Sequence, residues 1–166
     1  DTVVVGKFLG VDALAGVGST GSINFLVLGL CNGVCAGFAI PVAQKFGQKD
    51  FEGFRLFVGI MFWLGTAIAL IVTLATTTLC ASILRWMDTP EEAFSYAYDY
   101  IWVIFLGIPA TMLYNLLSGI IRSLGDSRTP LVFLILSSLM NVVLDIVFIV
   151  AFHMGVPGAG CATLLS

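Results

Sequence analysis

Four long apolar stretches limit what this chain can fold into. Crossing the hydrocarbon layer of a membrane, about 30 Å thick, takes about 20 mostly apolar residues in a helix. Apolar helical runs as long as these exceed what a buried helix of a soluble protein needs. The stretches cover residues 22–46, 57–84, 95–121 and 131–154. The sequence therefore predicts four complete transmembrane helices.

Two shorter apolar segments flank these four. Residues 2–9 look like the end of a preceding membrane helix, and residues 159–166 look like the start of a following one. The connections between the segments are short, which favours antiparallel neighbours. We expect residues 1–166 to form an all-α, polytopic membrane helix bundle with parts of six helices. We interpret the chain as an internal piece of a longer protein without a signal peptide.

The composition excludes two broad classes of protein. Hydrophobic residues make up 59% of the 166 residues and charged residues 10%, and the mean hydropathy is +1.07. Soluble domains contain about 45–50% apolar and about 25% charged residues, so a soluble globular fold is excluded. With 7 Lys and Arg and a net charge of −3, the chain has no basic surface for nucleic acid.

The four cysteines do not predict a metal site or a disulfide framework. They form no C-x-x-C pair, and no histidine stands at metal-ligand spacing from them. A free cysteine in an apolar segment packs as a small hydrophobic residue. We expect that role for all of them: Cys31, Cys35, Cys80 and Cys161.

The positive charges alternate between the predicted loops. Loops that carry an excess of Lys and Arg stay on the cytoplasmic side of a membrane. Five cations fall around two of the loops: Lys45, Lys49, Arg55, Arg122 and Arg128. The other two, Lys7 and Arg85, fall on the opposite side. We therefore predict that residues 45–55 and 122–130 are cytoplasmic, and that His153 is an interfacial residue near the outer face.

Local features inside the spans give further predictions. Three glycines at four-residue spacing, Gly29, Gly33 and Gly37, predict a helix face that another backbone approaches closely. Pro109 lies in the middle of the third span and should kink it, because proline removes one backbone hydrogen bond. Thr129, just before a proline, is expected to cap the start of the fourth complete helix.

The fourth span carries a buried carboxylate. At 1.5 Å per residue from Pro130, Asn141 lies about 17 Å and Asp145 about 22 Å along the helix, well inside the hydrocarbon. A carboxylate at such a depth costs about 2.5–3.5 kcal/mol and normally faces a bundle interior as an ion or proton site. Ser137, Asn141 and Asp145 recur every four residues, which places them on one helix face. We predict that this polar face points inward.

Asp1 is the second candidate carboxylate, six residues before Lys7 in the first partial span. Two carboxylates at similar depth could share a cation or hold their pKa values apart, which is the chemistry of coupling to H⁺ or Na⁺. A solvated Asp near a helix end is the alternative interpretation of Asp1. We expect Tyr114, Asn115 and Ser137 to line a substrate cavity.

Several segments in series resemble the N-terminal lobe of the multidrug and toxic compound extrusion (MATE) family. The resemblance covers the whole chain. The segments are DTVVVGKFLG (1–10), ALAGVG (13–18), PVAQKFG (41–47), SGIIRSLGDSRTP (118–130), NVVLD (141–145) and GVPGAGCAT (155–163). They correspond to the end of the first helix, the complete second to fifth helices and the start of the sixth.

The resemblance implies one six-helix lobe of a twelve-helix antiporter in a prokaryotic cell membrane. Such a protein exports organic cations or other toxic compounds in exchange for H⁺ or Na⁺ and uses no cofactor. This lobe would contact the lipid bilayer and the C-terminal lobe of the same chain. The DinF-like branch of the family builds a cation site from an Asp, an Asn and Asp pair, and a Thr. By motif these fall on Asp1, Asn141, Asp145 and Thr163.

Two other functions stay open at this point. A flippase for lipid-linked oligosaccharides or lipids, from the same superfamily, would share the helices but line its cavity with cations for phosphate. No Lys or Arg lies in the middle of a span. An intramembrane enzyme would need a nucleophile and base or a metal set within the bilayer. The single histidine lies at a span end, which disfavours an enzyme.

Overall fold

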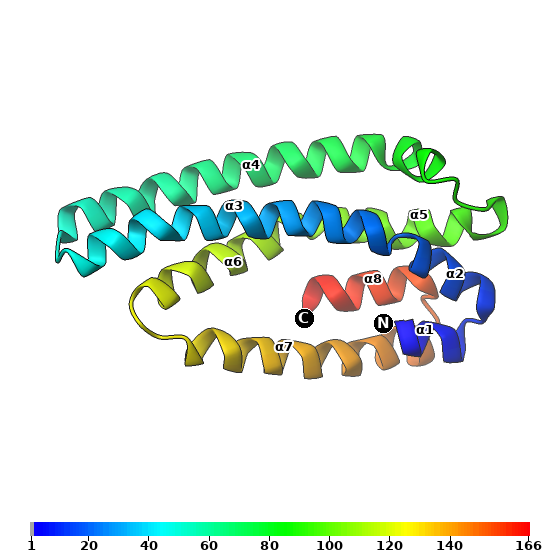
Figure 1. Ribbon diagram of the computed structural model, residues 1–166. Helices are drawn as coiled ribbons and strands as arrows, with labels where there is room; N and C mark the ends of the chain where they lie inside the picture. The colour runs from blue at the N-terminus through cyan, green and yellow to red at the C-terminus, as the bar shows by residue number, and fades with distance from the viewer. Residues whose placement is uncertain (1) are drawn as a thin grey trace.

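The computed structural model describes residues 2–166, and these form a bundle of helices without a β-strand (Figure 1). The predicted all-α class is confirmed. In chain order the helices are α1 (Thr2–Phe8), α2 (Val11–Ser19), α3 (Gly21–Gly47), α4 (Phe51–Trp86), α5 (Glu91–Leu106), α6 (Ile108–Ser123), α7 (Arg128–Ile146), the π-helix η1 (Val147–Ala151) and α8 (Val156–Leu165).

Four helical stretches are long and apolar enough to cross a membrane. Three of them are Val11–Gly47, Phe51–Trp86 and Arg128–Ala151, and the fourth is the bent pair α5 and α6. They match the four predicted spans. Large apolar side chains of α7 lie on the outside of the bundle, and those of residues 131–136 are each more than half exposed. Such a surface suits lipid rather than water.

The two cation-rich turns lie at the same end of the bundle. In Figure 1 the turn from α3 to α4 and the turn from α6 to α7 are both at the left, whereas α1, α2 and the turn from α4 to α5 are at the right. The helices therefore alternate in direction as the short connections predicted. That the cation-rich end faces the cytoplasm stays a prediction.

An ion pair closes the turn between α3 and α4. Lys45 Nζ lies 2.8 Å from Asp50 Oδ2, and the Gly53 amide donates to Asp50 Oδ1 at 2.9 Å. The hydrogen bond from Lys45 is the main reason why the pKa of Asp50 lies below its usual range, and the bond from Gly53 lowers it further. Asp50 thereby caps the first turn of α4.

The third span is broken between α5 and α6, as Pro109 predicted. The two helices meet at Gly107 at an angle of 43°. Pro109 lies in the first turn of α6 and has no amide hydrogen, so it cannot donate a helical hydrogen bond back into α5. The Gly107 amide instead donates to the carbonyls of Val103 and Ile104, which ends α5.

The start of α7 differs from the prediction, because Asp126 rather than Thr129 accepts the bonds there. The amides of Arg128 and Thr129 each donate to Asp126 Oδ1 at 3.0 Å, and the Thr129 hydroxyl donates to Asp126 Oδ2 at 2.5 Å. An ionised carboxylate is the stronger acceptor for the free amides of a first turn, so it takes the place predicted for the hydroxyl. The hydroxyl of Thr129 lowers the pKa of Asp126.

The predicted close approach at Gly29, Gly33 and Gly37 is wrong for the described part of the chain. A Cβ at any of the three would find no atom of another element within 4 Å. The close approaches occur at other glycines. A Cβ at Gly16 would meet Tyr96, and one at Gly160 would meet Val103, both at less than 3 Å. Small residues therefore bring α2 and α8 against α5.

Two clusters of buried apolar side chains hold the bundle together. The larger one joins α3, α4, α5 and α6 around residues such as Cys31, Met61 and Phe105. The smaller one lies where α1, α2, α5, η1 and α8 meet, and it includes Val5 and Ile149. The cysteines behave as predicted: Cys31, Cys35 and Cys80 are buried, Cys161 is half-buried, and all four are free.

Candidate functional site

Asp145 is the one buried carboxylate among residues 2–166. Its side chain is 0% exposed, although most of α7 around it faces outward. The less exposed face of α7 runs through Ser137, Asn141 and Asp145, which matches the predicted inward-facing polar stripe. A fully buried carboxylate within an apolar span requires polar partners or a bound cation.

Polar side chains from three helices lie around this carboxylate. Asn141, one turn earlier on α7, donates from Nδ2 to the Thr163 hydroxyl of α8 at 3.5 Å. That hydroxyl donates in turn to the carbonyl of Ala159 at 3.1 Å. Tyr100 of α5 is 7% exposed and lies close to both Thr163 and Asp145. The structure thus gathers an amide, two hydroxyls and a carboxylate.

Three of the four predicted cation-site residues are brought together. Asn141, Asp145 and Thr163 lie in the cluster just described, whereas Asp1 lies outside the described residues. His153 is exposed at the turn after η1, away from this cluster, as expected for an interfacial residue. Its ring lies near the carbonyl of Ala151, at 3.3 Å from Nδ1.

Tyr100 was not predicted from the sequence. It ends a run of alternating tyrosines, Tyr96, Tyr98 and Tyr100, that is typical of the aromatic belt at a membrane surface. Helical periodicity could have separated it from its neighbours. Tyr100 shares a face with Ala93 and Ala97, and this face is buried, whereas Tyr96 is 42% exposed.

The oxygen-rich cluster suits small hard cations. Carboxylate, amide and hydroxyl oxygens are the ligands that Na⁺-like hard ions prefer, and a carboxylate also accepts a proton. Transition-metal chemistry has no comparable support here. Residues 2–166 contain no group of three or more His, Cys, Asp or Glu side chains placed to hold a metal ion.

The predicted cavity residues divide into two groups. Tyr114 and Asn115 line a recess of about 490 Å³ between α6 and the start of α7. The Tyr114 hydroxyl donates to the carbonyl of Pro130 at 3.1 Å, and Asn115 donates to the carbonyl of Thr111 at 2.9 Å. Ser137 is not part of this lining and donates to the carbonyl of Ser166 at 2.7 Å instead.

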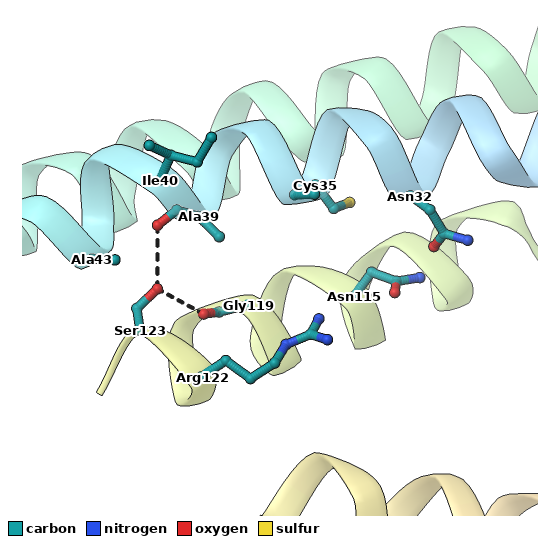
Figure 2. A pocket seen from close by; sticks show the side chains of 10 residues that line it. Asn32, Cys35, Ala39, Ile40, Ala43, Asn115, Gly119, Arg122 and Ser123 are labelled. Atoms are coloured by element: carbon teal, nitrogen blue, oxygen red, sulfur yellow. Dashed lines mark hydrogen bonds between the residues drawn. The ribbon is translucent and has the colours of Figure 1, made fainter. Parts of the chain in front are cut away.

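A second recess, of about 550 Å³, lies between α3 and α6 (Figure 2). The Ser123 hydroxyl joins its two walls, because it lies 3.2 Å from the carbonyl of Ala39 and 2.8 Å from that of Gly119. Asn115 and Arg122 line both recesses. The lining of the second recess is Asn32, Cys35, Ala36, Ala39, Ile40, Ala43, Asn115, Gly119, Arg122 and Ser123.

Comparison with known sequences places these features among transporters. Residues 1–147 match the family described as MatE. The whole chain is 32% identical to the probable multidrug resistance protein YpnP of Bacillus subtilis, and it spans 37% of that protein. Over 141 residues, 85% of the chain, it is 26% identical to the multidrug export protein MepA of Staphylococcus aureus, of which it covers 31%.

Solved structures agree with the sequence comparison. A crystal structure of a MATE protein in its bent conformation superposes on 99% of the chain with a TM-score of 0.93 at 29% identity. An inward-facing multidrug resistance transporter gives the same three values. The chain spans 36% of the first of these structures and 37% of the second, so it matches about a third of each relative.

Proposed function

Because the chain belongs to the MatE family and is a multi-pass membrane protein, we propose that the full-length protein exports small toxic organic compounds across the cell membrane. An opposing flow of H⁺ or Na⁺ drives this export. The relatives described above are a probable multidrug resistance protein and a multidrug export protein. Their kinship favours a transporter over an intramembrane enzyme.

The buried cluster around Asp145 is the observation that carries this proposal. A carboxylate that is 0% exposed in an apolar span is stable only when its charge is compensated or protonated. Binding of one cation, either H⁺ or Na⁺, meets that need. A bound cation shifts the protein toward the conformation that binds it more tightly, because a ligand shifts an equilibrium only through different affinities for the two states. Export becomes coupled if the cation must leave before the substrate cavity can bind the next substrate molecule.

We assign the coupling role to Asn141, Asp145 and Thr163, with Asp1 as a fourth member and Tyr100 as a positioning residue. Asp145 supplies the charge. Thr163 accepts from Asn141 and lies beside Tyr100, so it brings α5, α7 and α8 together near the carboxylate. Without Tyr100, this residue set is the one that the resemblance to the DinF-like branch implies.

The flippase alternative has less support. In the two recesses described above the cation of the lining is Arg122, and it lies in the last turn of α6 rather than in the middle of a span. A path for a lipid-linked phosphate would need cations along its length. We therefore place a cation-coupled exporter first.

The test is ethidium export by the purified full-length protein in liposomes with an imposed pH or Na⁺ gradient. Asp145→Asn keeps the size and most hydrogen bonds of the side chain but removes its charge. We expect export to fall to the level of protein-free liposomes. His153→Gln is the matched control, because His153 is an exposed polar residue outside the cluster, and it should export like the parent protein.

A graded series separates coupling from substrate binding. Tyr100→Phe, Asn141→Ala and Thr163→Val should each raise the H⁺ or Na⁺ concentration needed for half-maximal export while leaving the KM for ethidium nearly unchanged. Full export by well-folded Asp145→Asn under either gradient would contradict the proposed coupling site. A change in ethidium KM alone would move these residues to the substrate cavity.

A further inference from the structure

Arg122 carries a positive charge without a carboxylate partner. It lies in the last turn of α6, and its Nε donates to the carbonyl of Ser118 at 3.2 Å. That bond leaves the two terminal guanidinium nitrogens available. Figure 2 shows the side chain lying along α6, with its guanidinium group toward Asn115. No carboxylate of residues 2–166 forms an ion pair with Arg122.

The nearest acidic residue along the chain is engaged elsewhere. Asp126 accepts the first amides of α7 and the Thr129 hydroxyl with both of its oxygens. Neither of the two recesses that Arg122 lines includes an Asp or Glu side chain. The local charge in both recesses is therefore positive, which is the opposite of what an organic cation would need.

The recess between α3 and α6 combines this charge with a narrow wall of small residues. Ala36, Ala39 and Gly119 form part of the lining, and a Cβ at Gly119 would meet the Cβ of Ala39 at 3.2 Å. Ser123 uses its hydroxyl on the two backbones, so it offers little to a ligand. The polar groups that remain for a ligand are the Asn32 amide, the side-chain oxygen of Asn115 and the guanidinium of Arg122.

The positive recess is separate from the cluster around Asp145. Arg122 precedes the turn into α7, and Asp145 lies about 25 Å along α7 from the start of that helix at Arg128. One end of the lobe therefore presents a positive recess, and the buried negative charge lies toward the other end. A single substrate charge cannot compensate both.

We propose that the recess between α3 and α6 binds the carboxylate or phosphate of an anionic or zwitterionic amphiphile through Arg122. A guanidinium pairs with either group by two parallel hydrogen bonds, and the alanine wall accepts an apolar body. This inference rests on the proposed export function and adds to it a site for an anionic group, and its test separates the two proposals.

The test is binding of two fluorescent probes to the purified full-length protein, followed by anisotropy. Fluorescein carries a carboxylate, whereas ethidium is a cation. Arg122→Gln should weaken fluorescein binding about tenfold to a hundredfold, as loss of a charge-assisted pair does. Arg122→Lys should recover part of it. Arg128→Gln is the matched control, because Arg128 is an exposed arginine near the same end that lines neither recess.

The source of the anionic group is resolved by repeating the titration in nanodiscs. Phosphatidylglycerol added to phosphatidylcholine discs should compete with fluorescein if a lipid headgroup is the natural occupant. If it does not compete, the site takes a soluble anion. Either result supports the proposal when Arg122→Gln binds fluorescein more weakly than the parent protein in the same nanodiscs.

Three results would overturn it. Fluorescein could bind Arg122→Gln as tightly as the parent protein, Arg128→Gln could lose binding equally, or the parent protein could fail to bind fluorescein. Coupled ethidium export is measured on the same samples. If the parent protein does not export ethidium, the proposed exporter is refuted. If the parent protein exports ethidium but Arg122→Gln binds fluorescein as tightly as the parent does, only the anion site is refuted.

Discussion

Replacing Gly16 by alanine should separate α2 from α5. A Cβ at this position would lie 2.8 Å from the Cβ of Tyr96 and 3.1 Å from two backbone atoms, the Ala93 oxygen and the Ala97 nitrogen. None of these atoms belongs to the flexible end of a side chain, so a helix must move. Forcing a methyl group into such a contact costs about 1–3 kcal/mol.

The helix propensity of alanine offsets part of that cost. Alanine in a helix interior is favoured over glycine by about 0.5–1 kcal/mol. The net effect of Gly16→Ala is thus a loss of up to about 2.5 kcal/mol in the free energy of unfolding. Gly18 lies on the same helix, and a methyl group added there would find no atom of another element within 4 Å. Gly18→Ala should therefore be neutral or stabilising by up to about 1 kcal/mol.

The measurement is the apparent Tm of the detergent-solubilised full-length protein and its two variants. Gly16→Ala should melt below the parent protein and Gly18→Ala at or above it. Because Tyr100 lies one turn beyond Tyr96 on α5, Gly16→Ala should also weaken coupled ethidium export. Equal melting temperatures for the two variants would refute the packing argument.

Two further predictions concern the ends of the bundle. In a cysteine-free protein, Gln48→Cys and Glu92→Cys should react with a membrane-impermeant thiol reagent from opposite sides of the membrane, with position 48 on the cytoplasmic side. Labelling of both positions from the same side would refute the topology. Lys45 lowers the pKa of Asp50 in the folded protein, and Thr129 lowers that of Asp126. The two carboxylates therefore contribute their full stability above the unfolded pKa of about 4, and this contribution is lost as the pH falls through the lower native pKa. The Tm of the parent protein should therefore fall more on acidification below about pH 4 than that of the Asp50→Asn, Asp126→Asn double variant, and parallel curves would contradict this.

Much of the fold could be predicted because hydrophobic length is a strong constraint in a membrane. It located the four spans, and the lack of an amide hydrogen in Pro109 located the break. The burial of Asp145 could also be predicted, since a carboxylate at that depth has few tolerable environments. These properties belong to single residues or single helices.

What could not be predicted depends on which helix meets which. The spacing of Gly29, Gly33 and Gly37 defines a helix face, but it does not say whether a partner covers that face. Gly16 has no repeat around it of that kind, yet it has the closest contact with α5. Tyr100 joins the cluster because α5, α7 and α8 converge, a fact that no local pattern in α5 contains.

The break at Gly107 divides the third span into two parts with different neighbours. The first part, α5, packs on α2 and α8 as well as on α4, and it carries Tyr100. The second part, α6, packs on α3 and α4 and carries Arg122. The break therefore lets one span belong to two packing groups, so a change in the tilt of α6 would alter the recess between α3 and α6 while α5 stays packed against α2 and α8.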